Sequence, residues 1–455
     1  MYDLQWQSKK INEDKPLTKI SQACSIANGI CELNQDEIDI FIKEFDKFKG
    51  SCEMFIPASG SGSRMFESIN KFYFDKEHSS DQLELFFRKI QDFAFYELIP
   101  KNLIKDLHLT KNKKTLIHFL LDPEGFNFNV LPKGLIPFHR NLKNIFNPFQ
   151  DQILQGMGIH SNMKFHFTVQ KDFHDMIKSS INKITQNVHD LTAITYSYQS
   201  STSDSFVYDN NGVLVKDKLG NHLKKPSGHG ALLENLNDIQ SDIIFVKNID
   251  NIQHPDHSAQ TAKYFKVLAG LLLTLKSKFK EWKNNHSLVE IIEWNRKFHL
   301  FSESELKNDV FHLLNRPLRI CGMVKNEGEP GGGPFWMNNG NSISKQIVEG
   351  SQIDNSSEQI NIFQSASHFN PVFMVLDIKD LENKKYDLNN FANPNRYLKV
   401  SKNHDGQDIF FIERPGLWNG GMENWNTIFV EIPSGVFSPV KTVLDLLSPL
   451  HQPSN

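Results

Sequence analysis

Between residues 150 and 250 the sequence alternates short apolar stretches with amphipathic segments, and this alternation limits the folds open to the chain. The apolar stretches are KFHFTVQ (164–170), LTAITYSYQ (191–199) and DIIFVKNID (242–250), and helix-like segments separate them. Strands that alternate with helices in this way predict a mostly parallel sheet with helices on both faces. Sheets of this kind bind ligands at the carboxyl ends of their strands, so we expect a site there.

The segments on either side of this region predict the remaining parts of the chain. Residues 1–50 predict a helical extension, because the apolar residues of NQDEIDIFIKEFDKF recur at helical spacing. Residues 51–315 predict the α/β core, in which TLIHFLL (115–121) is a strand candidate. Residues 316–455 change to short strand-like stretches and predict a β-rich lobe.

The composition is typical of a globular protein and argues against some classes of partner. The chain of 455 residues is 39% hydrophobic and 23% charged, so it can bury a large core. Its net charge of -3 comes from 50 basic and 53 acidic residues, without a long block of one sign. We therefore expect no binding to nucleic acid or to a membrane surface.

The amino terminus and the cysteines bear on where the protein resides. The first residues lack the apolar core of a signal peptide, and the most apolar run, residues 267–275, is too short to span a bilayer. The four cysteines form no CxxC pair and are too few for a disulfide framework. We therefore expect a cytoplasmic protein.

The stretch IPASGSGSRMF, residues 56–66, follows a short apolar run and leads into a helix-like segment. Its small residues allow backbone N–H groups to approach an anion, and the start of a helix adds a partial positive charge. Arg64 can add a bidentate contact to phosphate. A P-loop requires a lysine that this stretch lacks, and the dinucleotide fingerprint requires a glycine where Met65 stands. The stretch is either an anion-binding loop or a plain turn rich in glycine and serine.

A second candidate is LPKGLIPFHR, residues 131–140. Lys133 lies between a proline and a glycine, a rigid and exposed setting in which its ammonium group can serve as a point charge on phosphate. The alternative is an ordinary lysine in a solvated turn. His139 stands alone beside an apolar run, which favours a structural histidine over a catalytic one.

A third candidate is KPSGHGALLENLNDI, residues 225–239. Its glycines allow the backbone to lie flat against a planar ring. The alternative is a helix entry that happens to contain glycine.

The fourth candidate is IIFVKNIDN, residues 243–251, a buried strand that ends in Asn248, Asp250 and Asn251. Oxygen ligands at such an edge suit Mg²⁺, which proteins hold with one or two carboxylates together with substrate phosphates and water. Asp and Asn also end strands because they favour turns, so this alternative stays open.

Taken in order along the chain, these motifs resemble those of the nucleotide-sugar pyrophosphorylases of the UDP-sugar type. They also resemble a bacterial family of similar length that looks like a distant branch of them. The loop motif GGxGTR is matched by residues 59–64, and the PKG motif by residues 132–134. Pro226, Gly228 and Gly230 match a uracil-contacting PxGxG segment, and residues 249–251 match a metal-bearing VDN segment.

The β-rich lobe carries further matches. Glu349 in QIVEGSQ matches a glutamate that contacts the sugar, and Asn370 matches an asparagine in a segment that leads into a strand. Lys441 in FSPVKT matches the lysine of an FSPxKN-like segment.

The resemblance implies a nucleotide-diphospho-sugar transferase fold of the GT-A-like Rossmann type. It implies that a sugar 1-phosphate attacks the α-phosphorus of a nucleoside triphosphate, with UTP favoured, Mg²⁺ as cofactor and pyrophosphate as leaving group. The catalytic residues would be Arg64, Lys133 and Lys441, and the metal ligand would be Asp250. The nucleotide-binding residues would be Ala58, Ser59, Gly60, Ser61, Gly62, Ser63, Pro226, Gly228, His229 and Gly230. The sugar-binding residues would be Gly322, Glu349 and Asn370.

Two departures from the family pattern keep an alternative open. Ser59 stands where the family has the first glycine of its loop, and residues 67–131 form a helical insertion before the PKG motif. The alternative is a nucleotide-binding or sugar-nucleotide-binding protein that has kept the fold and lost turnover. A glycosyltransferase on a related fold is disfavoured, because we find no DxD motif for its metal.

Overall fold

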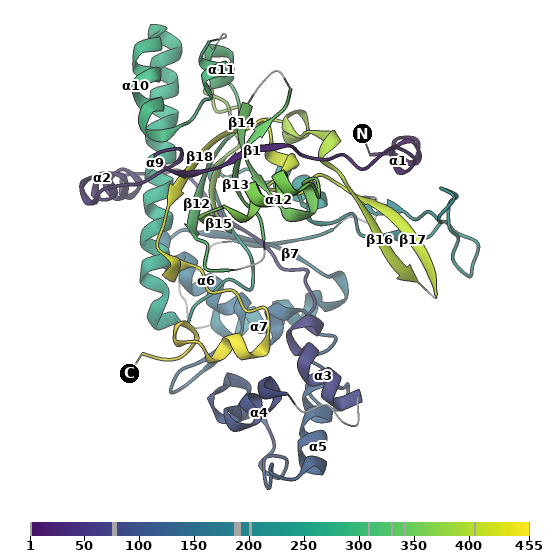
Figure 1. Cartoon of the computed structure of the whole chain (residues 1–455). Coiled ribbons are helices and arrows are strands. Elements are labelled where there is room, and N and C mark those ends of the chain that lie inside the picture. Colours follow the sequence, from purple (N-terminus) through teal and green to yellow (C-terminus); the bar gives the residue numbers. More distant parts are fainter. Residues whose placement is uncertain are drawn as a thin grey trace. The chain divides into compact units, whose positions relative to one another are not determined.

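The computed structural model describes residues 2–74, 80–185, 193–199, 203–307, 310–328, 331–340, 343–404 and 406–454 (Figure 1). The chain divides into two compact units, and each unit is built from three separate segments of the chain. Unit 1 comprises Met1–Ser51, Gln199–Val246 and Phe265–Pro433, and unit 2 comprises Cys52–Tyr198, Lys247–Tyr264 and Ser434–Asn455. The segment boundaries derived from the sequence remain a prediction.

Unit 2 contains a parallel three-stranded arrangement. The strands β4 (Cys52–Pro57), β7 (Lys164–Val169) and β8 (Ile194–Tyr198) lie in that order and are parallel throughout. Helix α6 (Pro148–Ile159) packs closely on them at Gly156, where an added Cβ atom would lie 2.5 Å from Phe165 and 2.7 Å from Met54. Helix α7 (His174–Thr185) packs against α6. The alternation of strand and helix predicted here is confirmed.

The described part of residues 67–131, which is 67–74 and 80–131, consists of helices and turns, and the bounds of the insertion remain a prediction. These residues form α3 (Glu67–Phe74), α4 (Asp81–Arg88), α5 (Thr110–Leu121) and short 3-10 turns, which Figure 1 shows as one group. Their own core is rich in phenylalanine and includes Phe66, Phe72, Phe86, Phe87, Phe93, Phe95 and Phe128. The strand predicted at residues 115–121 is wrong, because this stretch is the second half of α5. Its buried residues Leu116, Ile117, Leu120 and Leu121 recur at helical spacing, which a short apolar run alone does not reveal.

Unit 1 holds a larger mixed sheet. Its strand order is β2 (Ser25–Ile26), β3 (Gly29–Cys31), β18 (Asn426–Glu431), β12 (Leu318–Lys325), β15 (His368–Asp377) and β11 (Ile243–Lys247). The pairs from β2 to β12 are parallel, and β12 pairs with β15 in antiparallel fashion. The helices of this unit include α1 (Leu4–Ile11), α2 (Gln35–Asp46), α8 (Leu232–Asn237), α10 (Leu288–Phe298) and α11 (Glu303–Leu306). The 28-residue α9 (Ser258–Asn285) begins in unit 2 and continues into unit 1.

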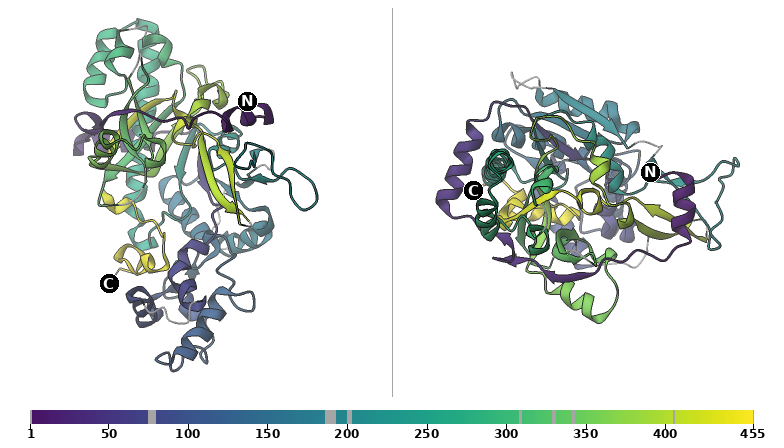
Figure 2. Two further views of the ribbon diagram at one scale, coloured as in Figure 1. Left: turned by 45° about the vertical axis from the view of Figure 1, so that its right-hand side comes forward. Right: turned by 90° about the horizontal axis from the view of Figure 1, so that it is seen from above.

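Smaller sheets complete unit 1. The strands β1 (Ile20–Ala23), β13 (Gly333–Asn338) and β14 (Ile343–Val348) form one sheet, against which α12 (Ser357–Gln364) packs. The strands β16 (Leu398–His404) and β17 (Gln407–Glu413) form a long hairpin, which Figure 2 shows as a twisted ribbon. The amino-terminal extension is therefore not only helical, because β1, β2 and β3 lie between its two helices. Strands of two to four residues give too little alternation to be read from a sequence.

These elements make a mixed α/β fold whose strands are mostly parallel and are flanked by helices, which confirms the predicted class. Among the helices of the described ranges, none is both long enough and apolar enough to cross a membrane.

Candidate functional site

The loop at residues 58–64 lies at the carboxyl end of β4, in unit 2. The N–H of Ala58 donates to Thr168 O at 2.9 Å, which extends the β4–β7 pairing by one residue. The side chain of Gln170 donates to Ser59 O at 2.6 Å. A 3-10 turn, Ser63–Phe66, then leads directly into α3. The predicted order of strand, small-residue loop and helical segment is therefore present.

The two glycines of this loop differ in what surrounds them. A Cβ atom at Gly60 would meet no other atom within 4 Å, so this glycine faces open space. A Cβ atom at Gly62 would lie 2.6 Å from Ile136 Cδ1 and 3.0 Å from Phe128 O. Gly62 is therefore required for packing, whereas Gly60 leaves room for a ligand to approach the backbone.

Lys133 follows the helical insertion and lies beside the loop at residues 58–64. Its backbone N–H donates to Gly60 O at 3.0 Å, and the N–H of Gly62 donates to Leu131 O at 2.9 Å. Ser61 and Pro132 form an isolated β-bridge between these hydrogen bonds. The helical insertion therefore begins and ends at the same place, because residues 131–133 pair with residues 60–62.

The side chain of Lys133 joins two further segments of unit 2. Its ammonium group lies 2.8 Å from Asp250 Oδ2 and 2.6 Å from Val440 O. The side chains of Lys133 and Asp250 are 13% and 25% exposed, so the ion pair is mostly shielded from water yet reachable. The N–H of Val440 donates to Asp250 O at 3.0 Å, which aligns the two segments. Three parts of the chain that are distant in sequence therefore meet at one lysine.

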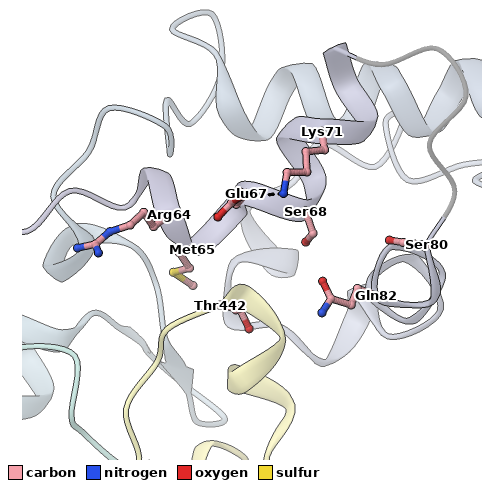
Figure 3. Close-up of a pocket in the computed structure, with 8 residues that line it drawn as sticks. All are labelled: Arg64, Met65, Glu67, Ser68, Lys71, Ser80, Gln82 and Thr442. Atoms are coloured by element: carbon pink, nitrogen blue, oxygen red, sulfur yellow. Dashed lines mark ion pairs between the residues drawn. The ribbon is translucent and has the colours of Figure 1, made fainter. Parts of the chain in front are cut away.

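Lys441 and Arg64 lie next to these contacts in sequence and are exposed. The backbone N–H groups of Lys441 and Thr442 both donate to Asp445 Oδ2 at 2.7 Å, which fixes the turn that carries Lys441. Arg64 and Thr442 help to line a cavity of about 290 Å³ (Figure 3).

Seven of the eight residues that line this cavity are polar or charged. Besides Arg64 and Thr442, the lining residues are Met65, Glu67, Ser68, Lys71, Ser80 and Gln82. Glu67 and Lys71 pair with one another at 2.9 Å. The guanidinium group of Arg64 points away from the other labelled side chains and does not pair with them (Figure 3).

The donor set at Asp250 limits the kind of metal site that it can form. Within the described residues, no three side chains of His, Cys, Asp or Glu are grouped so that they could hold a metal ion. Mg²⁺ at nucleotide sites takes one or two protein carboxylates and completes its shell with phosphate oxygens and water. Asp250 fits such a role for Mg²⁺ that arrives with a triphosphate, and it does not fit a metal held by protein alone.

The remaining predicted site residues lie in unit 1, and His229 has the most extensive contacts. Its ring stacks on Trp418 with ring centroids 4.3 Å apart. The N–H of Leu417 donates to His229 Nδ1 at 3.1 Å, so a neutral ring carries its hydrogen on Nε2, 3.8 Å from Glu349 Oε1. Loss of hydration among the surrounding protein atoms lowers the pKa of His229 to about 4, in keeping with a neutral ring.

The glycines next to His229 pack against the protein's own chain. Gly228 has a φ of +73°, and a Cβ atom there would lie 2.7 Å from Glu413 Oε2. A Cβ atom at Gly230 would lie 2.2 Å from Pro415 O. At both positions the missing side chain allows another group to approach the backbone closely, as predicted. That group is the protein's own segment 413–418. Pro226, at the start of this loop, is exposed.

The three residues predicted to contact a sugar have different surroundings. Burial raises the pKa of Glu349, which directly follows β14 and lies beside His229. Asn370 Oδ1 accepts the N–H of Val372 at 3.1 Å and thereby supports a bulge in β15, where Val372 has a φ of +56°. At Gly322 a Cβ atom would lie 2.3 Å from Ile432 Cδ1. Packing explains the glycine at position 322, and the bulge explains the asparagine at position 370. The side chain of Glu349 is 30% exposed, so a ligand can reach it.

Three residues that contribute to these places were not predicted from the sequence: Trp418, Glu413 and Thr442. Trp418 and Glu413 belong to ERPGLWNGG, residues 413–421, whose proline, glycines and tryptophan resemble the other candidate loops in composition. That composition was the available signal. Thr442 follows Lys441 directly and had no signal of its own.

The fold and these residues define an α/β protein with a small-residue loop, a lysine and an aspartate assembled at strand ends. The chain belongs to the family described as Domain of unknown function (DUF4301), whose model matches residues 2–452. No curated protein matches the chain.

Solved structures with overlapping folds include sugar-nucleotide enzymes at low identity. A protein assigned as a UDP-N-acetylglucosamine pyrophosphorylase from Entamoeba histolytica is 13% identical, with a TM-score of 0.48 over 93% of this chain and 84% of that one. A UDP-glucose phosphorylase from Trypanosoma brucei is 10% identical, with a TM-score of 0.46 over 98% and 75%. A mutant UDP-glucose pyrophosphorylase from Leishmania major, in complex with UDP-Glc, is 11% identical, with a TM-score of 0.46 over 98% and 76%. At these scores the overlaps carry no argument about activity.

Proposed function

We propose that the protein is a sugar-1-phosphate nucleotidyltransferase that makes a nucleoside-diphosphate sugar, with UTP as the favoured triphosphate. The observation that carries this proposal is the meeting of Gly60, Lys133 and Asp250. An open glycine, a cation and a carboxylate are the groups that a triphosphate with Mg²⁺ requires. The motif resemblance named the same three positions from the sequence.

The chemistry of this transfer demands alignment and charge neutralisation rather than a general base. An oxygen of the sugar 1-phosphate attacks the α-phosphorus, the bond to the β-phosphate breaks, and pyrophosphate leaves with the electron pair. The attacking phosphate is already anionic, so no side chain has to remove a proton. Preorganised cations that face the developing charge supply most of the rate enhancement in such sites.

Each residue of the candidate site has a role in this proposal. The backbone at Gly60 and Ser61, together with Arg64, would hold the triphosphate. Lys133 and Lys441 would neutralise charge on the phosphates, and Asp250 would hold Mg²⁺, which neutralises phosphate oxygens when bound. Because Lys133 now pairs with Asp250, substrate must share or replace this ion pair. The roles suggested by the resemblance for His229 and Glu349, contact with the base and with the sugar, remain predictions from the sequence.

A pyrophosphate-release assay over a panel of triphosphates and sugar 1-phosphates tests this function. We expect turnover with one pair of substrates, and a fall in kcat of about 10²-fold to 10³-fold in Lys133→Ala and Asp250→Asn. Lys143→Ala removes an exposed loop lysine from the same unit and serves as the control. Wild-type turnover in both site variants would contradict the assignment.

The Lys133–Asp250 ion pair also favours a second candidate, a nucleotide-binding or sugar-nucleotide-binding protein without turnover. Lys133 and Asp250 satisfy one another's charge within the protein, as a retained structural contact would. Calorimetric binding of UTP or of a UDP-sugar, combined with no pyrophosphate release over the whole panel, would favour this candidate over the enzyme.

A further inference from the structure

A continuous chain of four buried polar side chains lies in unit 2. Asp151 Oδ2 is 2.7 Å from His139 Nδ1, and His139 Nε2 is 2.8 Å from His451 Nδ1. His451 Nε2 is 2.7 Å from the hydroxyl of Ser438. None of the four residues is more than 7% exposed. The sequence favoured a structural role for His139 alone and did not indicate this chain.

The hydrogen-bond chain couples the positions of its protons. Burial lowers the pKa of both His139 and His451 to about 3, so each ring carries one hydrogen near neutral pH. Only two arrangements then give every contact one hydrogen. In the first, a protonated Asp151 donates to His139, and each group donates onward until His451 donates to Ser438. In the second, Asp151 is ionised, every bond is reversed, and Ser438 donates to His451.

The surroundings favour the first arrangement. Complete burial raises the pKa of Asp151 well above its usual range, and the first arrangement leaves no net charge in the chain. Two further imidazoles lie beside the chain, with the ring of His254 5.7 Å from that of His139 and the ring of His257 6.3 Å from that of His254. His254 lowers the pKa of Asp151, but by less than burial raises it. The guanidinium group of Arg140 is directed at Glu97 and at Gln91 O instead.

The hydrogen-bond chain ends at Ser438, in the segment that contacts the candidate site. The backbone N–H of Ser438 donates to Asn251 Oδ1 at 3.0 Å, and Pro439 forms a β-bridge with Asn251. Val440 follows, and its carbonyl accepts from Lys133. Residues 438–441 therefore run from the hydrogen-bond chain to the Lys133–Asp250 pair and end at Lys441.

We propose that Asp151, His139, His451 and Ser438 are positioning residues that hold residues 438–441 against Asp250. They thereby set the places of Lys133 and Lys441. The kinetic part of this proposal rests on the proposed function. The structural part, the immobilisation of Lys133 through Val440, does not.

The kinetic test compares chain variants with a matched buried histidine. Ser438→Ala and His451→Gln remove one link each, and we expect kcat to fall about 10-fold to 100-fold with little change in KM. Asp151→Asn can still bond His139 in either direction but cannot ionise. It should keep activity at neutral pH. In alkaline solution, where ionisation of Asp151 reverses the hydrogen-bond chain of wild type, we expect the wild-type kcat to fall and that of Asp151→Asn to stay unchanged. His166→Gln alters a buried imidazole of the same unit that lies between the hydroxyls of Thr195 and Ser197, so it should lower only the melting temperature. Equal kcat losses at equal melting temperatures in Ser438→Ala and His166→Gln would overturn the positioning role.

Two measurements on the intact chain do not depend on turnover. Lysine acylation followed by peptide mass spectrometry should show faster labelling of Lys133 in Ser438→Ala than in wild type or His166→Gln. Imidazole nitrogen NMR should show His139 and His451 with hydrogen on Nε2 at neutral pH. Unchanged Lys133 labelling would overturn the positioning role, and hydrogen on Nδ1 of both rings would overturn the first arrangement of the hydrogen bonds. If wild type releases no pyrophosphate from any substrate pair, the proposed function fails while these two results still decide the inference.

Discussion

At the scale of single residues, glycines with similar sequence settings differ in what they do. Gly60 and Gly62 stand two positions apart in one loop, yet only Gly62 has its missing Cβ position taken by neighbouring atoms. Two of the three atoms nearest that position are backbone carbonyl oxygens, of Phe128 and Leu131, which cannot move aside cheaply. Packing and ligand access are therefore divided between the two glycines.

This difference gives a paired prediction. Gly62→Ala should destabilise the protein by about 1–3 kcal/mol, because the added methyl group overpacks the contact with the end of the insertion and with Ile136. Gly60→Ala should be neutral or stabilising by up to about 1 kcal/mol, because it restricts the unfolded chain without meeting other atoms. Gly60→Ala should nevertheless weaken triphosphate binding. Urea unfolding and calorimetric titration check the two halves, and equal stabilities of the variants would contradict this reading.

Lys247, at the end of β11, is a second informative residue. It is fully buried, and its ammonium group donates to the side chain of Gln155. Burial lowers its pKa from 10.5 to about 7. Between these values the unfolded chain binds more protons than the folded one, so stability rises with pH across this window. Below pH 7 both states are protonated, and the cost of the buried charge is fully present.

Lys247→Met should therefore remove a slope of up to about 1.4 kcal/mol per pH unit between pH 7 and 10.5. The stability of the variant relative to wild type should be highest near pH 6 and should decline toward pH 10. Urea unfolding at several pH values measures this difference. A constant difference across the range would show that Lys247 stays charged in the folded protein.

At the scale of elements, α6 organises the turn that carries Asp250. A reciprocal capping box of Asn147 and Gln150 starts this helix. One turn later, the side-chain amide of Gln152 points its hydrogens at the carbonyl oxygens of Asn248, Ile249 and Asn251, at 3.0, 3.3 and 3.2 Å. A single buried side chain thus satisfies the backbone on both sides of Asp250.

Gln152→Met should destabilise the protein by about 1–3 kcal/mol, because it removes the amide that donates to the carbonyl groups of Ile249 and Asn251. The carbonyl of Asn248 still accepts the N–H of Asn251 at 3.1 Å. Gln152→Glu should cost more near neutral pH, since a carboxylate would face the same three oxygens, and protonation at low pH should recover part of the loss. Denaturant unfolding at pH 5 and pH 8 distinguishes the two variants. If Gln152→Glu matched Gln152→Met at both pH values, the amide would not be the organising group.

At the scale of the whole molecule, each unit is assembled from separated segments of the chain. Unit 2 needs its last segment, Ser434–Asn455, because Val440, Val443 and Leu446 are buried in the core formed with the helical insertion. Burial of each such side chain contributes about 1.5–3 kcal/mol. Together they approach the net stability of a typical domain, about 5–15 kcal/mol.

A chain that ends at Pro433 should therefore lose hydrogen-exchange protection in β4 and β7, whereas β12 and β18 of unit 1 should keep theirs. A chain that ends at Gln452 retains the three apolar residues and His451, and it should behave like wild type. Persistent protection of β4 in the shorter chain would mean that the last segment adds little to unit 2.

Sequence patterns predicted those parts of the fold that have a local cause. Buried strands and amphipathic helices leave a periodic signal, so β4, β7, β8, β11 and the alternation around them could be predicted. The loop at 58–64 could be predicted for the same reason, since small residues between a strand and a helix form a local signal. Strands of two to four residues and the second half of α5 could not, because a short apolar run has no period that separates strand from helix.

The sequence by itself therefore determined the class of fold and nominated the loop, Lys133 and Asp250 as separate candidates. Only the tertiary structure decided that Lys133 returns across the insertion to Gly60, that it pairs with Asp250, and that His139 joins a chain ending at Ser438. It also decided that the protein's own atoms occupy the space beside Gly228, Gly230 and Gly322. The physical reason is that a side chain's partners depend on contacts between segments hundreds of residues apart, and such contacts leave no local pattern in the chain.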